Sequence, residues 1–351
     1  MAADLQWSVS LIFFTQKPAR IQVRDSIAKS LEQFKTDMPT ETDIQPNVEF
    51  LARILQTASR LVCSFGWSDE STREFLSRNF ECLVLKGGKQ AFHLPNLGSK
   101  ASALKELVLA SSGIVEGLEQ FKNIEKITVA WLPRNGLDLS IFPQLKELSF
   151  EKEKRLENQL AEQENLEILS IEKYSGADCS KFSEVRNLRS LWLTQGGIRS
   201  LSGLELCSQL ESIELAYLRN LSNINALMHL KKMHIISLKN LPKAHGEIEI
   251  GNYPDLEFFY VSECKQLNVS LLGLRKLKRL KKLWLNTPST GLNWLDIFSL
   301  PEIEMVMIHA DEKMPDDDAL RSLAEQNGKR LTKIVHTGPR HKRGIQLYFS
   351  L

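Results

Sequence analysis

The stretch LKRLKKLWLN, Leu277 to Asn286, ends in the pattern LxxLxL, with leucines at positions 280, 283 and 285. Apolar residues alternate with other residues at the end of this pattern, as they do in a β-strand. The leucines therefore face one side, and Lys282 and Trp284 face the other. One short strand cannot bury an apolar side alone, so the stretch predicts neighbours of the same kind.

Copies of this pattern follow one another along the chain at intervals of 20 to 26 residues. The copies in frame are LKELVL (from Leu104), IEKITV (Ile124), LKELSF (Leu145), LEILSI (Leu166), LRSLWL (Leu188), LESIEL (Leu210), LKKMHI (Leu230), LEFFYV (Leu256), LKKLWL (Leu280) and IEMVMI (Ile303). Two outlying copies begin at Phe80 (FECLVL) and Leu331 (LTKIVH). Such repetition is typical of a solenoid, in which stacked repeats share one continuous core.

Over residues 79–340 these copies resemble the leucine-rich repeat family, and the regular copies are similar to its 22-residue internalin-like class. The resemblance implies an α/β fold, a curved horseshoe solenoid with a parallel β-sheet on its concave face and short helices or turns on its convex face. Family members usually carry an asparagine after the strand. Here that position holds residues such as Gly196 and Cys264, so we expect a less regular inner hydrogen-bond ladder and an altered curvature.

Residues 1–78 fall outside the repeat frame and predict a small α/β segment. Trp7 to Phe13 alternate like a strand, residues 23–34 have helical spacing, and a second helix is expected over residues 47–65. This segment is either an N-terminal cap for the first repeat or a small functional domain. Residues 79–351 would hold the repeats and a C-terminal cap. In that cap the three aspartates 316–318 are expected to begin a helix rather than to bind a metal.

Composition and charge favour a protein of the cytoplasm that binds neither nucleic acid nor membrane. The 45 lysines and arginines nearly balance 43 aspartates and glutamates. The basic run RKLKRLKK, residues 275–282, keeps leucines at every third position, so its charges are expected to be the outward positions of one repeat. The five cysteines form no CxxC pair, which fits a reducing compartment. The first residues lack the basic head of a secretory signal, no apolar run reaches about 20 residues, and a bacterial source is plausible.

Motifs of catalysis are missing from the sequence. It contains no HExxH, GxSxG or GxxxxGK[ST], so we expect a non-catalytic protein without a metal or cofactor. The segment LKGGKQ, residues 85–90, is expected to form a turn after the first strand. Cys82, Cys207 and Cys264 occupy core-like positions, so we expect them to be buried and inert.

The residue between the last two apolar positions of each copy should project from the concave sheet. That row reads Val108, Thr128, Ser149, Ser170, Trp192, Glu214, His234, Tyr260, Trp284 and Met307, and the row two residues earlier adds Lys232, Phe258, Lys282 and Met305. Large apolar side chains in such solvent-facing positions usually mark an interaction surface. The alternatives are a loop or C-terminal segment folded over this face, or a local slip of the register. The predicted partner-binding residues are Trp192, Glu214, Lys232, His234, Phe258, Tyr260, Lys282, Trp284, Met305 and Met307.

The sequence therefore predicts a protein that captures a protein ligand on its concave face. A bacterial immunity protein and a regulatory adaptor both fit this description. The competing hypothesis is an effector in which residues 1–78 carry an activity and the repeats select its substrate.

Overall fold

The computed structural model describes residues 60–309, 315–337 and 344–350. The chain divides into two units, Met1–Arg60 and Leu61–Leu351, and the second of them contains all the repeats. The strand expected at residues 7–13 and the helix expected at residues 23–34 lie outside the described residues. This division falls at Arg60, whereas the sequence places the end of the N-terminal segment at residue 78; the domain assignment of residues 1–78 and 79–351 stays a prediction.

One sheet of 14 strands runs the length of this unit, in the order β1-β2-β4-β6-β7-β8-β9-β10-β11-β13-β15-β17-β19-β18. Neighbours from β2 to β17 pair in parallel, and β19 pairs antiparallel with both β17 and β18. The strands are β1 (Arg60–Ser64), β2 (Cys82–Gly87), β4 (Glu106–Ser111), β6 (Lys126–Trp131), β7 (Glu147–Glu151), β8 (Ile168–Glu172), β9 (Ser190–Thr194), β10 (Ser212–Ala216), β11 (Ile235–Lys239), β13 (Phe258–Ser262), β15 (Lys282–Asn286), β17 (Met305–His309), β18 (Arg330–Thr337) and β19 (Gly344–Ser350).

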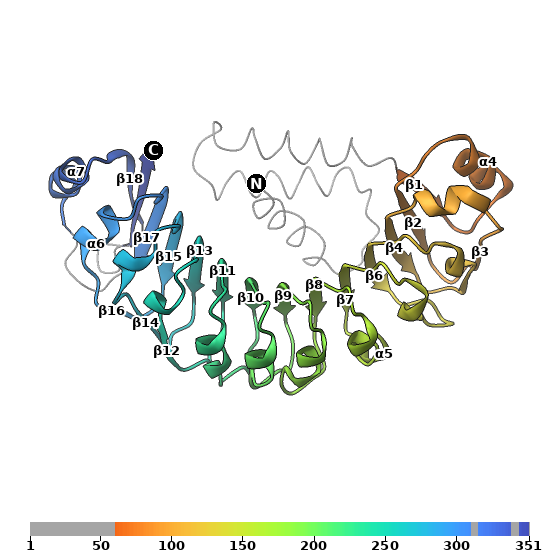
Figure 1. The fold of residues 1–351 in the computed structure, drawn as a ribbon, viewed down its shortest axis with the longest axis horizontal. Coiled ribbons are helices and arrows are strands. Elements are labelled where there is room, and N and C mark those ends of the chain that lie inside the picture. The colour runs from red at the N-terminus through yellow and green to blue at the C-terminus, as the bar shows by residue number, and fades with distance from the viewer. Residues whose placement is uncertain (1–59, 310–314, 338–343, 351) are drawn as a thin grey trace. The chain divides into compact units, whose positions relative to one another are not determined.

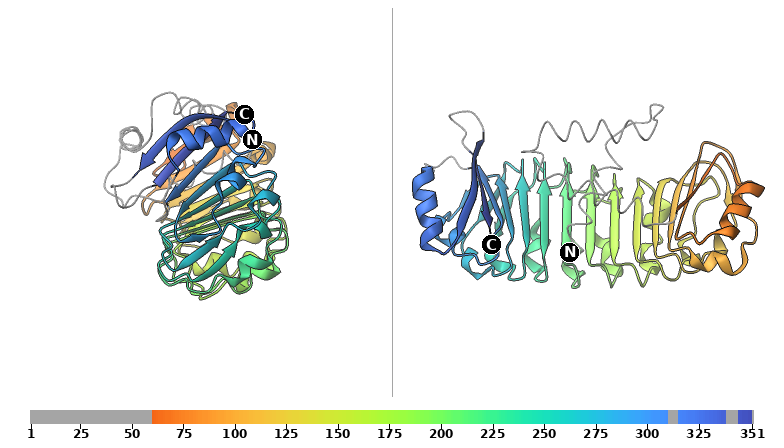
Figure 2. Two further views of the ribbon diagram at one scale, coloured as in Figure 1. Left: turned by 90° about the vertical axis from the view of Figure 1, so that its left-hand side faces the viewer. Right: turned by 90° about the horizontal axis from the view of Figure 1, so that it is seen from above.

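Short helices return the chain from each strand to the next. The sheet lines the inner side of the curved repeat unit and the helical turns lie on its outer side (Figures 1 and 2). The α-helices are α4 (Asp69–Ser77), α5 (Lys154–Glu157), α6 (Trp294–Phe298) and α7 (Asp317–Gln326). The 3-10 helices are η1 (Gly98–Ala103), η2 (Leu118–Gln120), η3 (Leu139–Ile141), η4 (Leu160–Glu162), η5 (Ser180–Glu184), η6 (Leu204–Leu206), η7 (Asn225–His229), η8 (Ile250–Asn252) and η9 (Leu274–Lys276).

Two small parallel sheets accompany the large one within the described residues. Strands β12 (Gly246–Glu249), β14 (Leu267–Ser270) and β16 (Ser289–Thr290) form one of them. Strands β3 (Phe92–His93) and β5 (Val115–Glu116) form the other. The predicted leucine-rich repeat solenoid, with one strand of a parallel sheet in each repeat, is therefore the observed architecture.

The core is the row of inward leucines and isoleucines shared by successive repeats. In the copy LRSLWL, the side chains of Leu188, Leu191 and Leu193 are completely buried. Leu191 pairs with Leu169 on one side and Ile213 on the other, so each inward residue packs between equivalents from its neighbours. This repeated stacking is why no single strand has to bury its apolar side alone.

The copy LKKMHI is framed wrongly in the sequence. Strand β11 begins at Ile235, and Ile236 pairs with Ile213 and Phe259. Met233, rather than Leu230, is therefore the first inward residue of this repeat, which shifts the frame by three residues. The shift makes the irregular spacings of 20 and 26 residues, from Leu210 to Leu230 and on to Leu256, into two equal spacings of 23 through Met233.

Both ends of the repeat array also differ from expectation. Residues 60–64, expected to lie in a helix, form β1, because alternating Leu61 and Cys63 are buried against the next repeat. The outlying copy LTKIVH is not a parallel repeat, since β18 pairs antiparallel with β19 in a closing hairpin. Asp316 caps helix α7 as predicted: its carboxylate accepts a hydrogen bond from the backbone N–H of Ala319 at 2.8 Å.

A left-handed residue follows the strand in six successive repeats, and none of the six is glycine. They are Lys152, Lys173, Gln195, Tyr217, Asn240 and Glu263, with φ between 34° and 58°. Each donates its backbone N–H to the carbonyl that ends the strand of the next repeat, over 2.7 to 3.0 Å. The ladder expected to be irregular is thus regular across these six repeats, and backbone geometry rather than an asparagine side chain makes it so.

Candidate functional site

The register of the sheet decides which side chains share the concave face. The central row reads Val84, Val108, Thr128, Ser149, Ser170, Trp192, Glu214, Ser237, Tyr260, Trp284, Met307 and Gln346. Ser237 and Ile235 therefore stand where His234 and Lys232 were expected. His234 and Lys232 precede β11, as a consequence of the three-residue shift, and the structure does not bring them into the predicted site.

Aromatic side chains gather on the C-terminal half of this face. Tyr260 and Trp284 lie opposite each other on β13 and β15, and their rings stack with centroids 5.5 Å apart and planes 28° apart. In the adjacent row, the Lys282 ammonium sits 5.2 Å above the centre of the Phe258 ring. All four side chains are partly exposed. Together with Met305 they form what we call the aromatic surface, which lies where sequence reasoning placed it.

Strand β19 extends this surface with residues that the repeat pattern could not reveal. The Gln346 amide donates to the Tyr348 hydroxyl at 2.6 Å and approaches the Met305 sulfur at 3.6 Å. Met307, between Trp284 and Gln346 in the central row, is only 4% exposed. It therefore supports its neighbours and offers a partner little surface, because side chains on the flanking strands stand about 5 Å away on either side.

At the centre of the face, the side chains are more buried than predicted. Trp192, expected to project into solvent, is 9% exposed. Its direct neighbour Glu214, on β10, is partly exposed, and burial raises the pKa of this carboxyl to about 6 although Lys239 acts in the opposite direction. Alternation along a strand fixes the side to which a ring points, while the crowding around it fixes how much of the ring is left in solvent.

The N-terminal part of the unit exposes large apolar side chains that the predicted row of concave residues does not contain. Trp131, at the end of β6, is 51% exposed, and an irregularity after Leu109 brings it opposite Ala110. Val62 on β1 is also exposed, and Phe65, which follows that strand, is 71% exposed. The register shift that exposes Trp131 carries no signal in the LxxLxL pattern.

The basic run from Arg275 to Lys282 is the outward side of one repeat, as predicted. Leucines 274, 277, 280 and 283 are all buried. Arg275 pairs with Asp296, and the Glu257 carboxylate accepts from Arg279 at 2.7 Å and Lys281 at 2.8 Å. Much of this positive charge is thus balanced by acids of adjacent repeats.

The five cysteines are buried and free, including the three for which burial was predicted. Burial raises the pKa of both the Cys207 and Cys264 thiols to about 11. Such thiols remain protonated near neutral pH, and the thiol form is a poor nucleophile. Their surroundings are those of structural cysteines.

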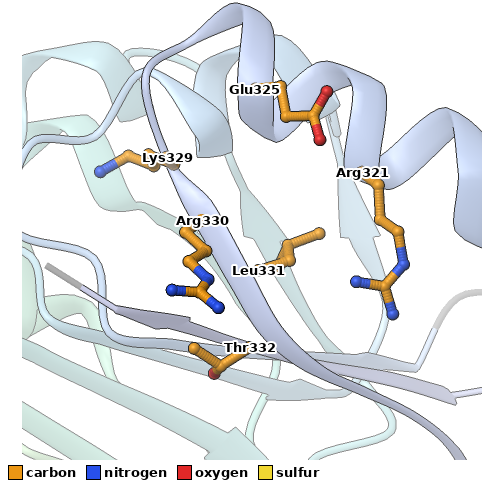
Figure 3. A pocket seen from close by; sticks show the side chains of 6 residues that line it. All are labelled: Arg321, Glu325, Lys329, Arg330, Leu331 and Thr332. Carbon is orange, nitrogen blue, oxygen red and sulfur yellow. The ribbon is translucent and has the colours of Figure 1, made fainter.

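The described residues offer little sign of other kinds of site. They include no group of three or more His, Cys, Asp or Glu side chains arranged to hold a metal ion. None of the helices described is long and apolar enough to cross a membrane. A surface cavity of about 480 Å³ lies between α7 and β18, lined by Arg321, Glu325, Lys329, Arg330, Leu331 and Thr332 (Figure 3). Lys329 donates to the Pro301 carbonyl at 3.3 Å. One of the three basic side chains that line this cavity therefore already has a partner.

Neither a family model nor a curated protein sequence matches this chain. Among solved structures, an internalin from Listeria monocytogenes is similar at 16% identity, covering 74% of this chain and 88% of its own, with a TM-score of 0.44. Internalin C2 from the same species has 16% identity, coverage of 55% and 83%, and a TM-score of 0.39. A leucine-rich repeat protein of Leptospira interrogans has 17% identity, coverage of 73% and 80%, and a TM-score of 0.40.

TM-scores below 0.5 at these identities carry no argument about this chain, so its own repeats identify the fold. Its LxxLxL copies each supply one strand to a continuous parallel sheet, with short helices on the opposite side. By this frame and this architecture, the chain has the leucine-rich repeat fold.

Proposed function

We propose that this protein binds a protein ligand with the aromatic surface on the C-terminal half of its concave sheet. The observation that carries the proposal is the stacked pair of Tyr260 and Trp284, which remains partly exposed beside Phe258 and Lys282. A monomer gains nothing by leaving such rings in solvent, and tyrosine and tryptophan dominate the energetic centres of protein interfaces.

The geometry favours a protein over a small ligand. The five residues lie on three adjacent strands, so they form a broad face rather than an enclosed pocket. Stacking fixes the orientation of both rings before a ligand arrives, which reduces the conformational entropy lost on binding. Lys282, above Phe258, would set the orientation of a partner through its charge.

The wider proposal keeps the other expectations from the sequence. The protein would act without catalysis and without a cofactor, in the cytoplasm, as an immunity protein or a regulatory adaptor. It would bind neither nucleic acid nor membrane. Buried free thiols are compatible with a reducing compartment.

A crosslinking experiment in the native cell tests the location of the site. A photoreactive phenylalanine analogue replaces Lys282 in the aromatic surface or, as the control, exposed Lys276 in helix η9 on the opposite side. We expect a specific adduct from position 282 only, and mass spectrometry then identifies the partner. Equal adducts from both positions would contradict the proposal.

The affinity of the identified partner is then measured with two tryptophan variants. Trp284→Ala should weaken binding about thirtyfold or more, since truncating a central aromatic anchor costs about 2 kcal/mol or more. Trp131→Ala removes an equally large exposed ring outside the aromatic surface and should leave the affinity unchanged. Normal binding by folded Trp284→Ala would exclude this surface as the site.

A further inference from the structure

A second cluster on the concave face has chemistry different from that of the aromatic surface. Strands β9 and β10 place Trp192 opposite Glu214, and Ser190 opposite Ser212. Trp192 and Ser190 are both at least nine-tenths buried, whereas Glu214 is partly exposed. Glu214 is therefore the residue of this centre that an incoming ligand meets first.

The charge of Glu214 is poorly balanced by the protein. Within the described residues it forms no ion pair. The cation that acts on it is Lys239, whose ammonium lies over the Tyr217 ring, 5.4 Å from its centre. Burial raises the pKa of Glu214 only to about 6, so the group is ionised at neutral pH. A carboxylate held in this way gains much from a cation that completes its surroundings.

Two further observations near this centre point to a ligand. The Ser190 hydroxyl is buried, with 5% of the residue exposed, and it has no hydrogen-bond partner among the described residues. On the next strand, β8, Glu172 lies opposite Thr194, two residues beyond Trp192; it is buried too, and Lys173, with which it pairs, also pairs with Glu151. The centre thus holds excess negative charge and an unused hydroxyl, and an N–H donor would satisfy both.

We propose that the Trp192–Glu214 centre receives a basic side chain, lysine or arginine, of the protein partner. This inference rests on the proposed function, since it names one feature of the same partner. The Glu214 carboxylate accepts from the ammonium or guanidinium group, and the Ser190 hydroxyl takes a further N–H. Trp192 forms the wall that keeps water away from the pair, which strengthens the attraction.

The sheet also gives the spacing that the partner must match. Glu214 on β10 is separated from Tyr260 on β13 by β11, which makes two steps between strands. At about 4.8 Å a step, Glu214 and Tyr260 lie about 10 Å apart. The partner therefore presents a basic group about 10 Å from the apolar group that covers Tyr260. This is about six or seven residues of a helix or three of an extended strand.

The Trp192–Glu214 centre can be tested without the partner. The probe is Nα-acetyl-arginine amide, titrated into the full chain at pH 7.5, with Nα-acetyl-citrulline amide as a neutral control of the same size. The readout is the ¹⁵N-labelled indole resonance of Trp192, assigned with Trp192→Phe. We expect the arginine compound to shift this resonance in a saturable way at millimolar concentrations, and the citrulline compound to leave it in place.

The variants separate this centre from the rest of the concave face. Glu214→Gln should weaken the arginine compound about tenfold, because the charge is lost while the shape is kept. Glu116→Gln, an exposed carboxylate that pairs with His93 in β3, should change nothing. No saturable shift, an equal shift with citrulline, or unchanged affinity in Glu214→Gln would each overturn the inference. Trp284→Ala should leave this titration unchanged. A failure of the inference about the Trp192–Glu214 centre can therefore be told apart from a failure of the proposal about the aromatic surface.

Discussion

Replacing Glu214 by glutamine should stabilise the fold, and the gain should depend on pH. Burial raises the pKa of this carboxyl from 4.5 to about 6. A raised pKa means that the folded state disfavours the charged form. The Glu214 carboxyl therefore costs the fold nothing well below pH 4.5, costs progressively more as the pH rises from 4.5 to 6, and has its full cost above pH 6. Glutamine keeps the shape of the side chain and removes the charge.

The size of the effect follows from the shift. A difference of about 1.5 pKa units corresponds to about 2 kcal/mol at about 1.4 kcal/mol a unit. This value is an upper bound, because the side chain is partly exposed and water screens its charge. Glu214→Gln should therefore raise the free energy of unfolding by about 1 to 2 kcal/mol at pH 7.5 and leave it nearly unchanged at pH 4.5.

Urea denaturation of both proteins at pH 4.5, 6.0 and 7.5 measures this difference. Glu125→Gln provides a control of opposite sign, because hydrogen bonds from Lys105 and Lys146 lower the pKa of Glu125. That variant should lose stability at pH 7.5 and approach the wild type as the pH falls. A Glu214→Gln protein no more stable than the wild type at pH 7.5 would show that the Glu214 carboxylate is adequately solvated or paired.

Four further expectations concern the core, the left-handed ladder, the aromatic surface and the thiols. Leu191→Ala should lower the free energy of unfolding by about 2–5 kcal/mol, and a loss below about 1 kcal/mol in denaturation would contradict its inward position. Gln195→Gly should raise stability by about 1 kcal/mol, since glycine adopts the left-handed conformation without strain, whereas Thr194→Gly, inside β9, should lower it in the same melt. Trp284→Ala should cost about 0.5 to 1.5 kcal/mol from its lost contact with Tyr260, and a much larger loss would make this tryptophan a core residue. The five thiols should resist a disulfide reagent in the folded protein and react in urea, and rapid labelling of the native protein would contradict their burial.

Most of the fold was predictable, because inward leucines repeat at nearly constant spacing and can be recognised without any tertiary information. The misframed repeat shows where that signal becomes ambiguous. Leu230, Met233 and Ile235 satisfy LxxLxL as well as Met233, Ile236 and Leu238 do. Only the second choice gives equal spacing to its neighbours, so the global period carried information that the local pattern lacked.

For the candidate site, the sequence predicted the face to which each side chain points but not how far each side chain is exposed. Alternation placed Tyr260 and Trp284 on one face, and pairing of β13 with β15 confirms that they are neighbours. It could not show that Trp192 is nearly buried while Trp131 is exposed, since both depend on surrounding side chains and on a register shift. Gln346 was missed because β19 is antiparallel and carries no repeat motif.

The six left-handed residues make neighbouring repeats depend on each other in one direction. In each case the donor belongs to one repeat and the acceptor to the repeat that follows it, as with Gln195 and the Ala216 carbonyl. When a repeat opens, the left-handed residue of the preceding repeat loses its hydrogen-bond acceptor. The left-handed residue of the following repeat keeps its acceptor, which lies one repeat further on. Local unfolding should consequently spread more readily toward the N-terminus than toward the C-terminus. Amide hydrogen exchange would reveal this polarity as protection lost asymmetrically around a destabilised repeat.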